Sequence, residues 1–178
     1  MAKKLNPTQF TKAVMRSFMK DSGLEPTLLG KHFRVLSAVE GKVEFELDIQ
    51  KSHTNRLQTL HGGTLASLVD LGGSLAVAST GRFATGVSTD LNGTHPIPSM
   101  HDPSDLLVTY LSPGGRPGDV LKGTATLDKI GKTLAFTQVT FTNSKGQLAA
   151  RGSHTKYVTD TMGEAGPYVA PAEFSDVD

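Results

Sequence analysis

The chain has 178 residues, enough for one domain with a sizeable core but too few for two. Its 18 basic and 17 acidic side chains give a formal net charge of +1, so we expect no nucleic-acid partner. Cysteine is absent, which excludes disulfides, a thiolate nucleophile and Cys-ligated metals. No apolar run approaches the roughly 20 residues of a membrane-spanning helix, so we expect no integral membrane segment.

The first 20 residues carry five basic side chains and no acidic one. This pattern fits either a mitochondrial transit peptide or an amphipathic helix that begins near Pro7. The i, i+4, i+8 spacing of Phe10, Val14 and Phe18 favours the helix. We expect a flexible segment at 1–8, a domain at 9–158, and a location in the cytoplasm or the mitochondrion.

The central region alternates between strand and helix patterns. Residues 33–39 and the strictly alternating Val43, Phe45, Leu47 and Ile49 flank a Glu40-Gly41 turn, which predicts a hairpin. Residues 62–79 are almost entirely apolar and predict a helix buried on most sides. Strands are expected at 120–127, 133–142 and 147–158, joined by short glycine-containing turns. A long buried helix with an antiparallel meander is an α+β domain.

The C-terminal segment 159–178 has the opposite composition to the first 20 residues. It contains five acidic side chains, no basic one, two prolines and two glycines. This composition predicts a disordered or loosely attached tail.

The clearest chemical signal is Asn55 followed by His61-Gly62-Gly63 and Asp70. The two glycines begin the predicted helix, so their N–H groups are unpaired first-turn donors that can face a carbonyl oxygen gaining negative charge. Such an oxyanion site contributes about 3–4 kcal/mol to a transition state. Asp70 lies eight residues further along this apolar helix, where a carboxylate is costly unless it is paired. It is therefore either a satisfied structural group or a base.

Three other features have simpler interpretations. Gly72 and Gly73 weaken a helix, which we attribute to close packing against another part of the fold or a partner subunit. The spacing of the histidines and of one acid around the helix matches no metal-ligand motif, so we expect no metal ion. These residues are His53, His61, His95, His101 and Asp102. For His154 we expect a structural role on a strand. No G-x-S-x-G elbow is present, which disfavours a serine hydrolase.

Five stretches together resemble one known family: HTNRLQTLHGGTLASLVD, GVSTDLN, VTYLSPG, GKTLAFT and HTKY. They are similar to the hotdog-fold acyl-CoA thioesterases of the thioesterase superfamily member 2 type, with the phenylacetate-pathway thioesterases as more distant relatives. The resemblance covers about residues 10–158. It implies an α+β hotdog fold, in which a five- to six-stranded antiparallel sheet wraps a central helix, with an extra N-terminal helix.

The resemblance also implies roles for particular residues. Asp70 matches the catalytic carboxylate, as general base or nucleophile, and Gly62 matches the glycine whose N–H polarises the thioester carbonyl. Asn55 and His61 match the residues that hold carbonyl and water, and Ser88 matches the hydroxyl that orients the water. Coenzyme A contacts map to Asp90, Tyr110, Ser112, Pro113, Lys129, Gly131, Lys132, Thr133 and Tyr157.

The resemblance further implies fatty acyl-CoA as substrate and no separate cofactor. In this family the aspartate and the glycine face each other across a subunit boundary, which implies a homodimer or homotetramer. Two alternatives are a non-catalytic acyl-CoA binding protein and a hotdog hydratase or dehydratase. Leu75 stands where such hydratases place a histidine, five residues after the aspartate, which disfavours the second alternative.

One segment departs from the family pattern. About fifteen residues, 93–107, separate two stretches that are nearly continuous in the relatives. Their three prolines cannot lie in a central strand, so the segment must leave the sheet. It is a lid, a simple loop or a gene-model error.

Overall fold

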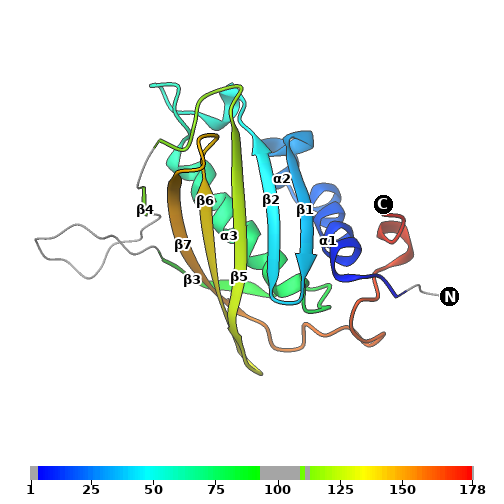
Figure 1. The fold of residues 1–178 in the computed structure, drawn as a ribbon. Helices are drawn as coiled ribbons and strands as arrows, with labels where there is room; N and C mark the ends of the chain where they lie inside the picture. The colour runs from blue at the N-terminus through cyan, green and yellow to red at the C-terminus, as the bar shows by residue number, and fades with distance from the viewer. Residues whose placement is uncertain (1–3, 93–108, 111–112, 178) are drawn as a thin grey trace, which may run out of the picture.

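One antiparallel sheet curls around one long helix in the computed structural model, which describes residues 4–92, 109, 110 and 113–177 (Figure 1). The strand order is β1-β2-β5-β6-β7-β3, and β4 pairs with β7 beyond the end of β3. The helices are α1 (Pro7–Asp21), α2 (Leu24–Leu28) and α3 (Gly62–Ala78). The strands are β1 (Phe33–Val39), β2 (Lys42–Asp48), β3 (Val87–Asn92), β4 (Thr109–Tyr110), β5 (Val120–Ile130), β6 (Leu134–Thr142) and β7 (Leu148–Tyr157). This arrangement confirms the predicted α+β hotdog fold.

The N-terminal segment is a folded helix that lies beside β1 (Figure 1). Asn6 caps α1, because its side chain accepts a hydrogen bond from the Gln9 N–H while the Gln9 side chain reaches back to the cap. Phe10 and Val14 are fully buried, as their spacing predicted. The expectation of a flexible segment at 1–8 is wrong for its described part, since Leu5 is buried and its N–H donates to the Tyr168 carbonyl.

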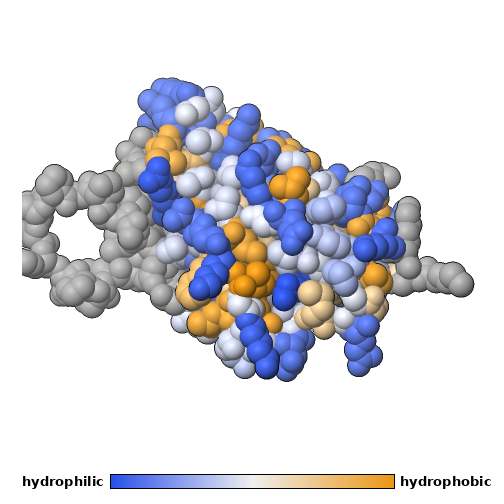
Figure 2. Space-filling view, turned by 60° about the horizontal axis from the view of Figure 1, so that its bottom comes forward, coloured by the Kyte–Doolittle hydropathy of each residue, from blue (hydrophilic) through white to orange (hydrophobic). Residues whose placement is uncertain are grey.

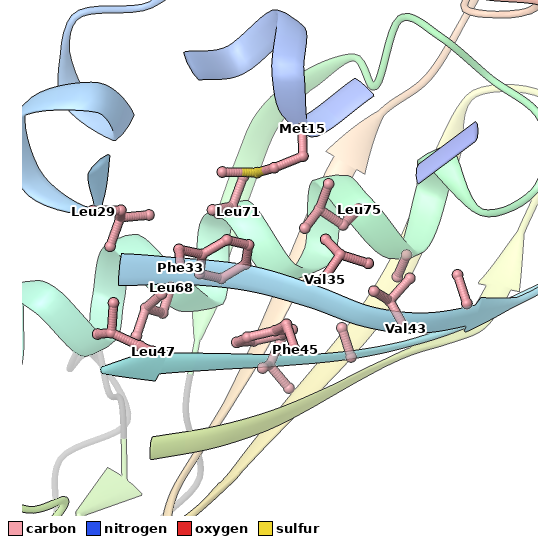
Figure 3. Close-up of a cluster of buried hydrophobic side chains, with 14 of the residues drawn as sticks. Met15, Leu29, Phe33, Val35, Val43, Phe45, Leu47, Leu68, Leu71 and Leu75 are labelled. Atoms are coloured by element: carbon pink, nitrogen blue, oxygen red, sulfur yellow. The ribbon is translucent and has the colours of Figure 1, made fainter. Parts of the chain in front are cut away.

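The main core lies between α1, α3 and the inner face of β1 and β2. Figure 3 shows Met15 of α1 above Leu71 and Leu75 of α3, with Phe33 and Phe45 of the sheet below. The alternating residues of β2 all point into this core, as the sequence pattern predicted. Because α3 contacts the sheet on one side and α1 on the other, it can be apolar on nearly every face.

The C-terminal segment is packed, which corrects the prediction of a loose tail. The Tyr168 ring contacts Phe10 with 5.6 Å between centroids, and its hydroxyl donates to the Ser79 carbonyl. Phe174, in a short 3-10 turn (Ala172–Phe174), stacks on Phe83 at 5.9 Å. The acidic composition suggested disorder, but the burial of two aromatic rings, Tyr168 and Phe174, attaches this segment to the domain.

Gly72 and Gly73 allow α3 to approach the sheet closely, as their interpretation as packing residues predicted. A Cβ atom at Gly72 would lie 3.1 Å from Val139, and one at Gly73 would lie 2.6 Å from both Thr137 Oγ1 and His154 Nδ1. The neighbours are side chains of β6 and β7.

Candidate active site

The first turn of α3 presents a backbone donor. His61 is the N-cap, and its Nδ1 accepts a hydrogen bond from the Gly63 N–H at 2.8 Å. Within the described part of the chain the Gly62 N–H has no hydrogen-bond acceptor. This free donor at the positive end of a helix has the chemistry of an oxyanion site.

Asn55 shapes the loop that leads into α3. Its Oδ1 accepts hydrogen bonds from the N–H groups of Leu57 and Thr59, and its Nδ2 donates to Thr59 Oγ1 at 2.9 Å. The side chain is therefore engaged with its own loop in this structure. Leu60 then continues the loop, its N–H donating to the Gly115 carbonyl.

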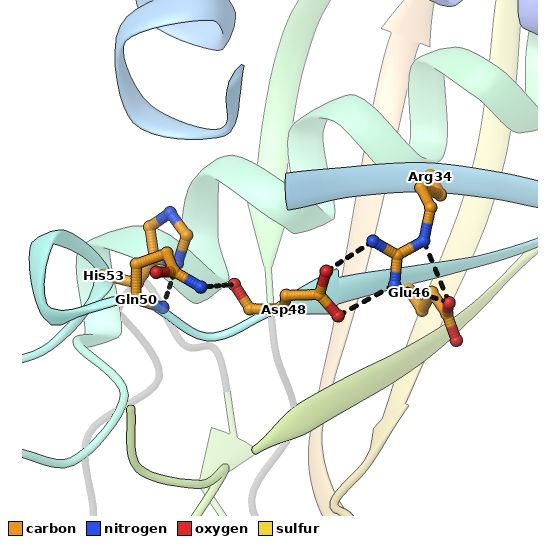
Figure 4. Close-up of polar contacts among 5 residues, drawn as sticks. All are labelled: Arg34, Glu46, Asp48, Gln50 and His53. Atoms are coloured by element: carbon orange, nitrogen blue, oxygen red, sulfur yellow. Dashed lines mark hydrogen bonds and ion pairs between the residues drawn. The ribbon is translucent and has the colours of Figure 1, made fainter. Parts of the chain in front are cut away.

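His53 fixes the segment that leads into the same loop, where it bonds to Gln50 (Figure 4). Its Nδ1 accepts the Gln50 N–H at 3.0 Å and its Nε2 lies 2.7 Å from the Leu28 carbonyl, which requires the neutral ring with the proton on Nε2. Burial lowers the pKa of His53, and the hydrogen bond to Leu28 opposes that shift. The His53 carbonyl accepts hydrogen bonds from the His61 N–H and the Thr64 hydroxyl. A fully buried histidine thus fixes the start of α3.

The strand before this loop carries an ion-pair network that continues toward His53. Arg34 of β1 reaches across to Glu46 and Asp48 of β2, and the Gln50 side chain donates to the Asp48 carbonyl (Figure 4). Hydrogen bonding to Arg34 lowers the pKa of Asp48. The network is partly exposed, so it contributes little to stability.

Asp70, the one charged residue of α3, faces three polar side chains from the sheet. The Ser88 hydroxyl of β3 donates a 2.9 Å hydrogen bond to its Oδ1. The same oxygen lies 3.3 Å from His154 Nε2 and 3.8 Å from Lys156 Nζ, both on β7. The predicted partners Asp70 and Ser88 are therefore brought together.

Two members of this cluster had no predicted catalytic role. His154 was assigned a structural role, and it does lie on a strand, but its ring touches the carboxylate. Lys156 was not singled out, although it belongs to the HTKY stretch. The available signal is the period of two in β7, which places both residues on the face that α3 covers.

Gly62 and Asp70 do not meet within one chain. Eight residues along a helix correspond to about 12 Å, too far for both groups to contact one thioester carbonyl. Asn55, His61 and Pro113 lie near the start of α3, since Gly114 and Gly115 pack on Leu60. Within one chain, Gly62 and Asp70 thus belong to two separate groups of predicted site residues.

The residues assigned to coenzyme A divide in the same way. Gly131, Lys132 and Thr133 form the β5–β6 turn beside Tyr157, because the Val158 N–H donates to the Thr133 carbonyl. Lys129 precedes this turn at the end of β5. Pro113 lies at the other end of the sheet, lining a pocket of 390 Å³ with Arg116 and Lys145.

Three of these assignments are only partly covered by the structure. Backbone pairing places Asp90 opposite Thr155 and Tyr110 opposite Ala150, while their side chains and the whole of Ser112 lie outside the described residues. Tyr110 is thus about 23 Å along β7 from Tyr157. The segment 93–107, with His95, His101 and Asp102, also lies outside the described residues.

Two further observations concern the described residues alone. They contain no group of three histidine and carboxylate side chains arranged to hold a metal ion. Among the helices of the described ranges, none combines the length and apolar character needed to cross a bilayer.

Comparisons with known proteins agree with this architecture. Residues 104–150 match the family model described as thioesterase superfamily. Human acyl-coenzyme A thioesterase 13 is 40% identical over 152 residues, which cover 85% of this chain and 96% of that protein. The crystal structure of zebra fish thioesterase superfamily member 2 is 35% identical, covering 86% of this chain and 98% of that one, with a TM-score of 0.69.

A more distant solved structure shares the fold alone. The PaaI protein from the phenylacetic acid degradation operon of E. coli is 20% identical, with a TM-score of 0.62, and the match covers 83% of this chain and 94% of that one. With 40% identity to the human protein over most of both chains, a wrapped central helix and the carboxylate cluster on it, the chain belongs to the hotdog-fold thioesterase superfamily.

Proposed function

We propose that the protein hydrolyses fatty acyl-CoA to a free fatty acid and coenzyme A. The observation that carries this proposal is the Asp70 carboxylate, held by Ser88 at 2.9 Å on an otherwise apolar helix whose first turn offers a free N–H. A positioned base and a preorganised oxyanion donor are the two groups that thioester hydrolysis needs. The names of the 40% identical relatives support coenzyme A as the thiol.

The proposed reaction uses these groups in sequence. The Gly62 N–H binds the thioester oxygen, and Asp70 removes a proton from a water molecule held by Ser88. Asn55 and His61, from the same copy as that Gly62, hold the carbonyl and the water in place. The water oxygen attacks the carbonyl carbon, the C–S bond breaks, and the coenzyme A sulfur takes up the proton. Direct attack by Asp70, with later hydrolysis of the anhydride, uses the same two groups. Neither route needs a metal or a separate cofactor.

The proposed active unit contains at least two copies of the chain. Because Gly62 and Asp70 are about 12 Å apart on one helix, a complete site requires Gly62 of one copy to meet Asp70 of another. The proposed pairing is supported by β3, which is an edge strand of the described sheet and begins with Val87, a side chain that is 63% exposed. An apolar patch also interrupts the polar surface in Figure 2.

Pairing would also complete the coenzyme A site. The turn Gly131–Thr133 carries Lys132 next to Tyr157, and these residues suit a phosphate and an aromatic ring of the nucleotide. Asp90, Tyr110, Ser112, Pro113 and Lys129 are the remaining proposed contacts. Two copies bring the Pro113 end of one chain toward the Tyr157 end of the other, as they do Gly62 and Asp70.

The test is thiol release from acyl-CoAs of increasing chain length by the wild type and Asp70→Asn. We expect turnover in the wild type and a loss of at least about a hundredfold in the variant, because asparagine cannot act as a base. Asp21→Asn, at an exposed carboxylate at the end of α1, is the matched control and should keep normal turnover. Near wild-type turnover in Asp70→Asn would remove Asp70 from the chemistry. Binding of acyl-CoA without turnover in the wild type would contradict hydrolysis and favour a binding protein.

A further inference from the structure

Lys156 is the one lysine of the described residues buried to 97%. It lies on the α3-facing side of β7, opposite Ser88 of β3 and Ala135 of β6. An isolated ammonium in this position would be strongly disfavoured, so it requires a counter-charge. The Asp70 carboxylate, with 3.8 Å between Nζ and Oδ1, supplies it.

We propose that Lys156 is a positioning residue of the active site, whose buried ammonium holds the Asp70 carboxylate in its reactive orientation. This inference rests on the proposed function and names a residue that acts through Asp70 rather than on the substrate.

The geometry around Asp70 supports this role. Ser88, His154 and Lys156 all approach one oxygen, Oδ1. These contacts come from two strands and converge on one oxygen, so they define the direction in which the carboxylate points.

Stability alone is a weak explanation for this pair. Burying an ion pair gains little over packing apolar groups of the same volume, because desolvation offsets the attraction. Asp70 itself is 49% exposed in the single chain, so water can solvate its carboxylate there without a counter-ion. Orientation of the carboxylate is a function that an apolar residue at 156 could not provide.

The charge of Lys156 is sensitive to pH. Burial lowers the pKa of Lys156 below the usual lysine value, and the negative charge of Asp70 opposes that shift. Among the described side chains, the titratable groups facing Lys156 are Asp70 from α3 and His154 from β7, and the residues paired with it on β3 and β6 are the uncharged Ser88 and Ala135. The alkaline limit of activity should therefore fall below the ordinary lysine pKa.

The kinetic test compares Lys156→Met and Lys156→Arg with the wild type, using acyl-CoA turnover corrected for spontaneous hydrolysis. We expect Lys156→Met to lower kcat roughly tenfold to a hundredfold while KM changes little, since substrate binding is untouched. Lys156→Arg should recover part of the loss and extend activity to higher pH, because a guanidinium keeps its proton. Lys122→Met, at an exposed position of β5, is the control.

The pH profile separates positioning from a merely structural role. In the wild type, kcat should fall toward the Lys156→Met value as Lys156 loses its proton, and the variant should lack this limb. An unchanged kcat in Lys156→Met, or a loss that is equal at every pH and is not relieved by arginine, would overturn the inference.

A second measurement does not depend on turnover or on a stable methionine variant. The Lys156 side chain can be titrated by NMR through its Cε carbon in the wild type and in Asp70→Asn. Loss of the carboxylate should lower the pKa of Lys156, because the charge that supports its proton is gone. An unchanged titration would overturn the ion pair. A wild type that pairs these groups but hydrolyses no acyl-CoA would refute only the proposed function.

Discussion

Gly62 and Asp70 lie on the same helix, one at its first residue and one at its ninth, so the helix itself keeps them about 12 Å apart. At this distance the free Gly62 N–H and the Ser88-bound Asp70 carboxylate of one chain cannot act on the same thioester group. In the two-fold dimer proposed above, each site would take its N–H from one copy and its carboxylate from the other.

This relationship predicts complementation between two inactive variants. Gly62→Pro removes the N–H at a position where proline is tolerated, since it is the first helical residue and His61 is extended, with ψ 140°. Mixed with Asp70→Asn after partial unfolding and reassembly, half of the dimers are hybrids with one intact site each. Thiol release should recover to about one quarter of the wild-type value.

The control for this experiment is Gly62→Ala, which keeps the N–H and shows what the added side chain alone does to turnover. Absence of recovery in verified hybrids would place both groups in one chain's site.

His53 predicts a loss of stability on acidification. Burial lowers its pKa, so below the ordinary histidine pKa of about 6.5 the unfolded chain binds the proton more readily than the folded one. The free energy of unfolding should therefore be constant above that pH, as far as His53 is concerned, and should fall as the pH drops below it. Urea unfolding between pH 8 and 5.5 measures this slope.

The variant His53→Gln identifies the source of the slope. It should be less stable than the wild type at pH 8 by about 1–3 kcal/mol, because the Gln50 N–H and the Leu28 carbonyl lose well-placed partners. Its stability should then depend less on pH than that of the wild type. An equal slope in both proteins would assign the acid sensitivity to other groups.

Patterns within one element predicted much of this fold, while contacts between elements did not follow from them. The alternation in 43–49 and the spacing of Phe10, Val14 and Phe18 predicted β2 and α1 because each pattern reports which face is buried. The hydrogen bond between Ser88 and Asp70 joins residues 18 apart, and only the family resemblance indicated it. Lys156 was missed because a strand lysine is normally solvated, and only the position of α3 shows that this one is covered.

Phe174 predicts that the C-terminal segment contributes to stability. Its ring is 6% exposed, stacks on Phe83 and lies under the Lys20 ammonium, which is 5.2 Å from its centroid. Phe174→Ala should lower the free energy of unfolding by about 2–4 kcal/mol through lost burial and an unfilled cavity. Met162→Ala, at a side chain that is 43% exposed, should change it by less than about 0.5 kcal/mol. Equal effects in urea unfolding would mean that the segment is not held by this ring.

Gly73 and Gly72 predict different tolerance for alanine on one helix. Alanine gains about 1 kcal/mol of helix propensity at either position. At Gly73 the new Cβ would lie 2.6 Å from Thr137 Oγ1 and His154 Nδ1, and overpacking of this kind costs about 1–3 kcal/mol. At Gly72 the nearest atom is 3.1 Å away, so the two effects should nearly cancel. Urea unfolding should therefore give Gly73→Ala a lower free energy of unfolding than Gly72→Ala.

The same two variants should differ in activity. Because the displaced His154 ring contacts Asp70, kcat should fall in Gly73→Ala and not in Gly72→Ala. Equal stability and kcat would show that α3 can move away from β7 at no cost.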